Sequence, residues 1–481
     1  MSSANSISKG LFWKLFERFG VQSVQFALQI VLARILDPDH YGVLSLMIIF
    51  TTLANVFIQS GLNTALIQNK EITEKDYSSV FWISISIATV LYIAIFFASP
   101  LIAIFYETPA ITQPLRVLAL MLFPGALNSV QLAKITREMN FKKVFLSNIT
   151  AVIVSGVVGI VIACNGGGLW ALVAQTLLNV LITCIVMTFT SKLKLHFYCN
   201  FDRVKMLFRF GWKLLVSSLL ETLYNDLRSL VVGKKYDAAT LGFYDKGKQF
   251  PQFIISAATG AVQSVMLPAM SAQQDDKSKI KELMRNSMTI SSYIVFPVMT
   301  GLAAVAAPLV SIVLTDKWLP CVPYLQIYCF SLAFNPIHSC NLQAINAMGR
   351  SDLFLILEII KKSYGIALLT MAVVFFESPL AIALTGTITT VISCFVNAFP
   401  NKKLIGYSYF DQMKDILPSL LLSLAMMVAV LAVGHFLVFA PVFELLIQVI
   451  AGVAVYLVLS AIFKPKPFVI LIKSGKKALK I

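Results

Sequence analysis

Charged residues are scarce in this 481-residue chain, where Asp, Glu, Lys and Arg make up 13% and apolar residues 58%. Soluble domains carry about 25% charged residues, so the composition excludes an ordinary soluble fold. Acidic residues are the scarcer kind, with 23 Asp and Glu against 39 Lys and Arg and a formal net charge of +16. Since no basic domain outside the apolar segments could hold a duplex, we expect contact with membrane lipids and no nucleic-acid partner.

Signatures of catalysis and metal binding are also missing. The sequence has no Walker motif, no acidic cluster on a long loop, and no CxxC or Cys/His spacing. The seven cysteines are scattered, mostly within apolar runs, and are interpreted as small buried hydrophobic residues. The first apolar segment lacks a small-residue cleavage site, so no secretory signal peptide is indicated. We expect no catalytic residue, no metal, no cofactor, and a transporter instead of an enzyme.

Long apolar runs dominate what the sequence does contain. A membrane-spanning helix needs about 20 apolar residues, and about fourteen segments qualify. They are approximately 11–35, 41–66, 78–104, 115–136, 144–164, 168–190, 208–232, 240–270, 283–314, 322–346, 353–376, 378–398, 415–437 and 442–463. Alternate loops collect about 26 basic residues against about five, which makes their side cytoplasmic by the positive-inside rule. An even number of spans then leaves both termini in the cytoplasm.

Two of these segments carry a polar stripe at helical spacing. The first stripe consists of Lys14, Arg18, Gln22, Gln25 and Gln29. The pattern returns about 199 residues later, again with a helical period, in Lys213, Ser217, Glu221, Tyr224 and Arg228. A charge at the centre of a bilayer costs roughly 2.5–3.5 kcal/mol. We therefore expect both stripes to avoid lipid and to line one solvated central cavity.

The two stripes belong to an internal repeat. Trp13-Lys14-Leu15 is matched by Trp212-Lys213-Leu214, and the turn at Tyr41-Gly42 by Leu241-Gly242. The predicted fold is an all-α polytopic membrane protein with about fourteen transmembrane helices. Two six-helix lobes, 1–200 and 201–400, form a parallel pseudo-two-fold repeat around the cavity. Residues 401–481 add two helices and a basic cytoplasmic tail.

Several motifs resemble those of polysaccharide flippases. The run Ala33-Arg34-Ile35-Leu36-Asp37-Pro38-Asp39-His40-Tyr41-Gly42 resembles the Ala-Arg-x-Leu-x-Pro-x-x-aromatic-Gly turn of that family. Further similar motifs are Ser60-Gly61-Leu62, Gly242-Phe243-Tyr244, Leu267-Pro268-Ala269-Met270-Ser271 and Ala347-Met348-Gly349-Arg350. The chain is identified as a member of the polysaccharide-transporter branch of the multidrug/oligosaccharidyl-lipid/polysaccharide superfamily. It is similar to O-antigen and colanic-acid-type exporters.

This resemblance implies a function in the bacterial cytoplasmic (inner) membrane. An undecaprenyl-pyrophosphate-linked oligosaccharide would move by alternating access from the cytoplasmic to the outer leaflet, for O-antigen, capsule or exopolysaccharide synthesis. The expected partners are this substrate, membrane lipids, H+ or Na+ as a coupling ion, and polysaccharide polymerase and chain-length proteins. The motifs select neither a glycan nor an ion.

Candidate site residues follow from the chemistry of such a substrate. Cations suit the pyrophosphate, and the candidates are Arg18, Lys14, Lys213, Arg228 and Lys248. Amides and aromatic rings suit the glycan, and the candidates are Gln22, Gln25, Gln29, Asn55, Gln59, Tyr224 and Asn225. Glu221 and Asp226 are candidates for ion coupling. Structural alternatives remain open, because Lys14 can snorkel, Arg228 can contact headgroups, and Glu221 can pair with Arg228.

Two other functions compete with a lipid-linked oligosaccharide flippase. A cation-coupled multidrug exporter of the same superfamily predicts an acidic, apolar-walled pocket, and the cationic stripes argue against it. A membrane glycan polymerase or glycosyltransferase predicts a large loop or clustered carboxylates. Neither feature occurs in the sequence.

Overall fold

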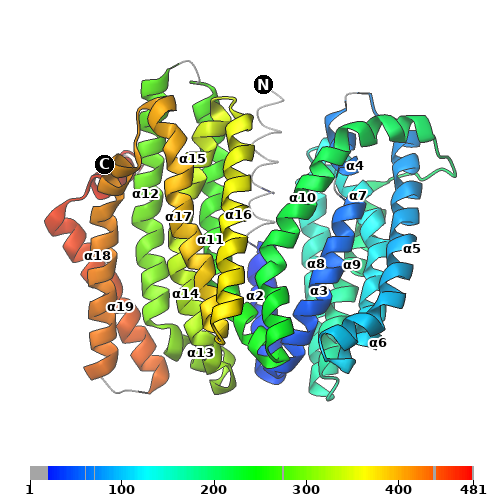
Figure 1. Ribbon diagram of the computed structural model, residues 1–481, viewed down its shortest axis with the longest axis horizontal. Coiled ribbons are helices and arrows are strands. Elements are labelled where there is room, and N and C mark those ends of the chain that lie inside the picture. The colour runs from blue at the N-terminus through cyan, green and yellow to red at the C-terminus, as the bar shows by residue number, and fades with distance from the viewer. Residues whose placement is uncertain are drawn as a thin grey trace. The chain divides into compact units, whose positions relative to one another are not determined.

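The structure is a computed structural model that describes residues 13, 20–59, 61–69, 71–273, 276–436 and 440–478. Every regular element in these ranges is helical (Figure 1). Nine of the helices described there are long and apolar enough to cross a membrane. These features confirm the prediction of an all-α polytopic membrane protein. The number of crossings, the two-lobe layout and the central cavity stay predictions.

The long helices overlap the predicted apolar segments, while η2, η4 and α20 lie outside them. The earlier ones are α2 (Gln22–Ile35), α3 (Pro38–Gln59), α4 (Leu62–Gln68), α5 (Glu74–Phe105), η2 (Pro109–Ile111), α6 (Thr112–Leu118), η3 (Ala119–Met121), α7 (Leu122–Arg137), α8 (Phe141–Cys164), α9 (Leu169–Ser191) and α10 (Phe201–Lys235). The later ones are α11 (Ala238–Ser271), α12 (Lys277–Ala304), α13 (Ala306–Leu314), η4 (Asp316–Cys321), α14 (Val322–Ala333), α15 (Asn335–Ala347), α16 (Ser351–Phe375), α17 (Pro379–Ile405), α18 (Tyr409–Phe436), α19 (Pro441–Phe463) and α20 (Lys466–Ala478).

Some predicted single spans are interrupted helices. α3 and α4 are separated at Gly61, whose φ of 91° lies in the left-handed region that favours glycine. α12 and α13 are separated at Val305, and α14 and α15 at Phe334. Pro336 stands in the first turn of α15, where its missing N–H is tolerated. A hydropathy pattern does not register such interruptions, because the apolar residues continue across them.

Three long helices begin at a capping side chain after a connecting segment. Thr73 and Asp76 form a reciprocal capping box at α5. The side chain of Asn200 accepts hydrogen bonds from the first backbone N–H groups of α10. The side chain of Asp276 does the same for α12. These caps fix where each helix starts at the end of its connection.

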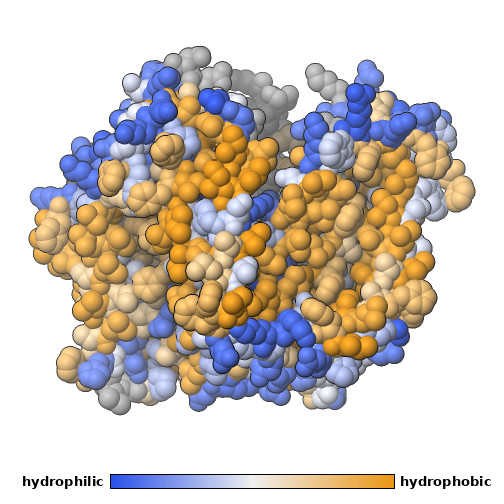
Figure 2. All heavy atoms as spheres, in the orientation of Figure 1, coloured by the Kyte–Doolittle hydropathy of each residue, from blue (hydrophilic) through white to orange (hydrophobic). Residues whose placement is uncertain are grey.

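The chain divides into two compact units, with the boundary between Gly242 and Phe243. In the first unit α8 packs along α9, and α10 packs on α3, α4 and α5. In the second unit α12 packs on α14 and α18, and α18 packs on α19. The helices are mostly apolar along their middles and hydrophilic at their ends (Figure 2). The predicted division into 1–200, 201–400 and 401–481 stays a prediction, although the first unit also contains α10.

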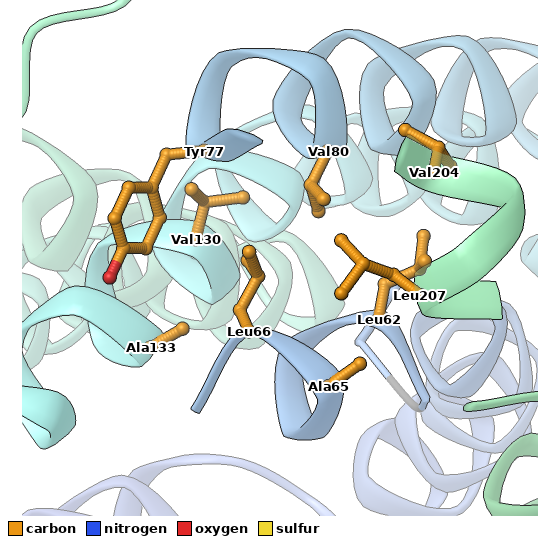
Figure 3. Packing of buried hydrophobic residues seen from close by; sticks show 9 residues of the cluster. All are labelled: Leu62, Ala65, Leu66, Tyr77, Val80, Val130, Ala133, Val204 and Leu207. Carbon is orange, nitrogen blue, oxygen red and sulfur yellow. The ribbon is translucent and has the colours of Figure 1, made fainter. Parts of the chain in front are cut away.

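A small apolar core joins four helices of the first unit at the start of α10 (Figure 3). Its members are Leu62, Ala65 and Leu66 of α4, Tyr77 and Val80 of α5, Val130 and Ala133 of α7, and Val204 and Leu207 of α10. Close packing, more than exclusion of water, holds helices together in a membrane. This core therefore fixes the first turns of α10 on α4 and α5.

The second unit contains a polar core where α15, α17 and α18 meet. Asn341, Asn401 and Gln412 are fully buried there. The Nδ2 of Asn341 donates to Gln412 Oε1 at 2.8 Å, and the Nδ2 of Asn401 donates to Asn341 Oδ1 at 2.7 Å. Gln412 Nε2 returns a hydrogen bond to Asn341 Oδ1 at 3.0 Å. Such bonds tie the three helices together because buried amides need partners.

Candidate functional site: the polar flank of α10

The second predicted stripe lies along one flank of α10. A helix turns by about 100° per residue, so Lys213, Ser217, Glu221, Tyr224 and Arg228 share one side. The side chains of Lys213, Ser217 and Glu221 are exposed, and those of Tyr224 and Arg228 are partly buried. Glu221 forms no ion pair with any residue that the structure describes. The stripe is therefore a continuous polar surface.

The neighbouring flank of α10, about 100° around the helix from the stripe, is apolar. Trp212, Val216, Leu220 and Leu223 recur there at helical spacing, and all four are exposed. A third, narrow face carries Gly211, which is buried against the first unit. α10 thus separates an apolar surface suited to lipid from a charged surface that lipid disfavours.

At the C-terminal end of the stripe, Arg228 stacks on an aromatic ring. Its guanidinium lies 5.7 Å from the centroid of the Tyr224 ring, one helical turn earlier. This i,i+4 cation–π contact restricts the orientation of the guanidinium. Asn225 is exposed and Asp226 is partly buried on neighbouring positions of the same helix.

The start of α10 is clamped to α5 by an ion pair. Arg203 donates from Nε to Asp76 Oδ1 at 3.0 Å and from Nη2 to Asp76 Oδ2 at 3.1 Å. Asp76 is only 4% exposed and also accepts from the backbone N–H of Thr73. Arg203 Nη2 donates to the carbonyl of Glu71 as well. The bidentate geometry fixes the direction in which α10 leaves the unit.

Two glycines let α10 touch the break between α3 and α4. A Cβ on Gly211 would lie 2.4 Å from the carbonyl carbon of Gly61, and one on Gly61 would lie 2.4 Å from the Gly211 oxygen. Both distances are far below a van der Waals contact, so neither position accepts a side chain without movement. This backbone-to-backbone contact places the polar flank at a fixed distance from α3.

The far end of α10 has an ionic anchor. Lys234 Nζ donates to Glu107 Oε1 at 2.9 Å and lies 5.1 Å from the centroid of the Phe105 ring. The hydrogen bond and charge of Lys234 hold the pKa of the Glu107 carboxyl below its usual value. Contacts at both ends and at Gly211 therefore attach α10 to the first unit.

A reciprocal contact follows immediately after α10. A Cβ on Gly42 would lie 1.8 Å from the carbonyl oxygen of Ala238, and a Cβ on Gly242 would lie 2.2 Å from that of Pro38. Gly42 thus packs on Ala238, four positions before Gly242, and Gly242 packs on Pro38, four positions before Gly42. The first turns of α3 and α11 cross at backbone distance, which only glycine permits.

The glutamines of the first stripe share a face of α2 but differ in their surroundings. Gln25 is exposed and Gln22 is partly buried. Gln29 Nε2 donates to Gln175 Oε1 on α9 at 3.4 Å, and Gln175 is 4% exposed. Gln29 therefore already has a partner within the first unit. Gln175 was not among the predicted site residues, because no pattern along α9 relates it to the first stripe.

The remaining candidates are dispersed. Asn55 lies beside α7, with its buried Oδ1 3.0 Å from the Cβ position of Gly125 and no hydrogen-bond partner among the described residues. Gln59 is exposed at the end of α3. In the second unit, Lys248 on α11 is partly buried. Lys14 and Arg18 lie outside the described residues.

A buried lysine near Lys248 was not among the candidates. Lys246 is 4% exposed, and its ammonium lies 5.5 Å from the centroid of the Trp318 ring. The sequence shows only an Asp-Lys pair at this position, which gives no sign that the lysine is buried. The structure instead packs Lys246 against η4, where the indole ring covers the charge.

Comparison with known proteins decides the family. The sequence pattern of a family described as "Polysaccharide biosynthesis protein" matches residues 31–323, more than half of the chain. The chain belongs to this family. The prediction of a polysaccharide transporter of the multidrug/oligosaccharidyl-lipid/polysaccharide superfamily, and not an enzyme, is confirmed.

Two relatives align with this protein over most of their length. The "Succinoglycan biosynthesis transport protein ExoT" of Rhizobium meliloti (strain 1021) is 23% identical over 467 residues, which cover 94% of this chain and 91% of the relative. The "Lipopolysaccharide biosynthesis protein WzxC" of Escherichia coli (strain K12) is 24% identical over 449 residues, covering 90% and 89%.

The fold is also that of a solved flippase. The structure titled "Lipid II flippase MurJ, inward closed conformation" superimposes with a TM-score of 0.75 at 17% identity. The superposition covers 94% of this chain and 98% of that one. At this identity the likeness establishes the shared helical fold.

Proposed function

We propose that the protein moves an undecaprenyl-pyrophosphate-linked oligosaccharide from the cytoplasmic to the outer leaflet for surface polysaccharide synthesis. The family membership supports transport in polysaccharide biosynthesis. The observation that carries the proposal is the flank of α10, where cations and hydrogen-bonding groups form one exposed surface next to an apolar one. Such a surface suits a substrate with a charged, hydrophilic head and a lipid tail.

The cations would replace the water that the pyrophosphate loses when it leaves the interface. Lys213 and Arg228 lie on the α10 flank, and Lys248 lies on α11. Lys14 and Arg18 belong to the first stripe, before its glutamines in the sequence. Arg offers a planar fork to phosphate oxygens, and Lys offers a compact charge. The stacking of Arg228 on Tyr224 supports a fixed guanidinium. The inner end of the stripes would receive the pyrophosphate first.

The glycan would use amides and aromatic faces. Gln22, Gln25 and Gln59 keep free surface for hydrogen bonds, and Tyr224 and Asn225 follow on α10. Gln29 would exchange its contact with Gln175 for a sugar hydroxyl, and Asn55 is the most enclosed of the set. The polyprenyl tail would remain in lipid along the apolar flank of α10.

Ion coupling, where it occurs, would use a carboxylate on α10. Glu221 is exposed within the cationic stripe, and Asp226 lies more than a turn further along. A carboxylate among cations can bind H+ or Na+ and so change the net charge of the surface. The proposed setting is the inner membrane, with both termini in the cytoplasm and polymerase and chain-length proteins as later partners.

Reconstitution with defined substrates tests this function. Full-length protein in liposomes should flip a fluorescent undecaprenyl-pyrophosphate oligosaccharide, measured by protection from an external glycan-cleaving enzyme. Lys213→Gln/Arg228→Gln should slow flipping at least about tenfold, because each lost charge-assisted contact removes roughly 1.5–3 kcal/mol. Lys402→Gln/Lys403→Gln, which removes two exposed charges from α17, should leave the rate unchanged.

Other outcomes would reject the proposal. Uptake of organic cations without flipping would favour a multidrug exporter, and elongation of the glycan would favour a polymerase. Equal rates for wild type and the α10 variant would remove the cationic flank from the mechanism. For coupling, Glu221→Gln should abolish the dependence of flipping on an imposed ion gradient, and an unchanged dependence would contradict that assignment.

A further inference from the structure

A second basic region lies within the second unit and contains none of the residues assigned above. A cavity of about 970 Å³ is lined by residues of α12, α18, α19 and the start of α20. Five basic residues line it, namely Lys281, Arg285, Lys414, Lys464 and Lys466. Two carboxylates, Asp411 and Asp415, are the only acidic residues among its described lining. The cavity therefore carries a net positive charge.

Both carboxylates are already engaged. Asp415 accepts hydrogen bonds from Arg285 and from the hydroxyl of Tyr407, the latter at 2.8 Å. Asp411 accepts from the Ser408 hydroxyl at 2.6 Å. In these contacts both carboxylates and the guanidinium of Arg285 already have partners. The contacts also hold the wall of the cavity in place.

Three lysines remain without a counter-charge. Lys281 donates to the carbonyl of Gly406 at 2.6 Å. Lys414, Lys464 and Lys466 make no hydrogen bond or ion pair with any residue that the structure describes. They come from α18, from the end of α19 and from the start of α20. Three ammonium groups from three elements thus line one concave surface, which suits an anion.

The rest of the cavity is apolar. It is lined by Leu417, Pro418, Leu421, Leu422 and Ala425 of α18 and by Leu459 and Phe463 of α19. Leu421 and Phe463 are 56% and 69% exposed. Leu421 follows Lys414 on α18 and Phe463 directly precedes Lys464 at the end of α19, and both helices are of membrane-spanning length. A nucleotide or a free phosphate would leave this apolar wall uncovered. An amphiphile with an anionic head would fill both parts.

α20 completes the head end of the cavity. Its sequence alternates basic and apolar residues, as in helices that lie in a membrane interface. Phe468 packs on Tyr293 of α12 with ring centroids 6.4 Å apart, which anchors the helix on the second unit. Lys466, in the first turn of this helix, is thereby held in the lining of the cavity, and basic residues of interfacial helices attract anionic headgroups.

We propose that this cavity binds one anionic glycerophospholipid of the cytoplasmic leaflet. Lys414, Lys464 and Lys466 hold the phosphodiester, and an acyl chain lies along α18 and α19. Charge complementarity selects an anionic headgroup over a zwitterionic one. The site shares no residue with the proposed route of the transported lipid, so its occupant is a bound membrane lipid and not the cargo.

Native mass spectrometry on the full-length purified protein tests the site. Dioleoyl-phosphatidylglycerol should bind at least about tenfold more tightly than dioleoyl-phosphatidylcholine, because each juxtamembrane lysine contributes roughly a fivefold preference. Lys414→Gln/Lys464→Gln/Lys466→Gln should lose this preference. The matched control Lys402→Gln/Lys403→Gln/Lys473→Gln removes the same charge from residues outside the cavity and should keep it within about twofold.

Three results would overturn the proposal. Equal losses in both triple variants would mean diffuse attraction without a site. Displacement of phosphatidylglycerol by inorganic phosphate, or tighter binding of undecaprenyl phosphate, would assign the site to another source of phosphate. Leu421→Trp, which fills the apolar wall without changing charge, should weaken dioleoyl-phosphatidylglycerol binding several-fold, and unchanged binding would contradict an acyl-chain site.

Discussion

At the scale of single residues, the most constrained polar contact of the first unit is the pair between Arg203 and Asp76. The carboxylate is buried and accepts from three groups, while the guanidinium remains about one third exposed. Water therefore weakens the interaction only in part. The pair lies beside the apolar core of α4, α5, α7 and α10, so its loss should loosen the start of α10.

Arg203→Ala should lower the stability of the protein in detergent by about 1–2 kcal/mol, because Asp76 loses two charge-assisted hydrogen bonds. The change is measured as a decrease in the melting temperature of the purified protein. Arg209→Ala, on the same helix and with an exposed side chain, serves as the control and should melt like wild type. A melting temperature for Arg203→Ala equal to that control would show that the core alone fixes α10.

Local charge pairs were predictable at this scale. Glu358 and Lys361 stand at i,i+3 spacing, which favours a pair on one helix, and Lys361 Nζ donates to Glu358 Oε1 in the structure. The pair between Arg203 and Asp76 was not predicted, since 127 residues separate its members. Spacing along one helix specifies neighbours, whereas a contact between helices depends on how the chain packs.

At the scale of elements, α10 is held by glycine contacts as much as by charge. Gly211→Ala should separate α10 from the break at Gly61, because the new Cβ would lie 2.4 Å from a backbone carbon. Overpacking of this kind costs about 1–3 kcal/mol, and flipping should decrease with it. The measurements are the melting temperature and the flipping rate in liposomes.

Gly301→Ala provides a matched substitution in the last turn of α12. Its Cβ would lie 3.4 Å from the flexible end of Met426, so the neighbour can adjust. Alanine also favours a helix by about 1 kcal/mol over glycine. We expect Gly301→Ala to melt at the wild-type temperature or above it. A similar loss in both variants would mean that any Gly→Ala change in a helix is harmful here.

The elements themselves were largely predictable because apolar length decides where a helix can lie in a membrane. The stripe on α10 was predictable as well, since its period follows from helix geometry. The breaks at Gly61 and Phe334 were not, because they depend on backbone conformation. The contact between Gln29 and Gln175 was also beyond the sequence, because nothing in it places α9 beside α2.

At the scale of the whole molecule, the basic residues predict which ends of the helices face the cytoplasm. Single cysteines in a cysteine-free protein test this orientation. Lys402→Cys, at the end of α17, should react with an impermeant maleimide only from the cytoplasmic side, and Glu377→Cys, between α16 and α17, only from outside. Labelling of both from one side would contradict the predicted topology.

Each unit has an ion pair between two of its helices, and the order of acid and base along the chain is reversed between the units. In the first unit an acid on α5 meets a base on α10, and in the second a base on α12 meets an acid on α18. Starting residues recur in order, with Pro38, Glu74 and Phe141 matched by Ala238, Lys277 and Ser351. The two units thus share the order of their helices but differ in the charged residues on those helices.

The crossing of α3 and α11 has a consequence for the symmetry of the chain. Gly42 packs on Ala238 as Gly242 packs on Pro38, so each copy of the turn gives and receives the same contact. Such mutual exchange is the mark of an isologous interface, which two identical subunits form around a dyad. The two copies of the turn therefore meet inside one polypeptide as two identical subunits would meet. A side chain at either glycine would collide with the backbone of the other copy, so both positions require glycine, whereas the two polar stripes differ in sequence.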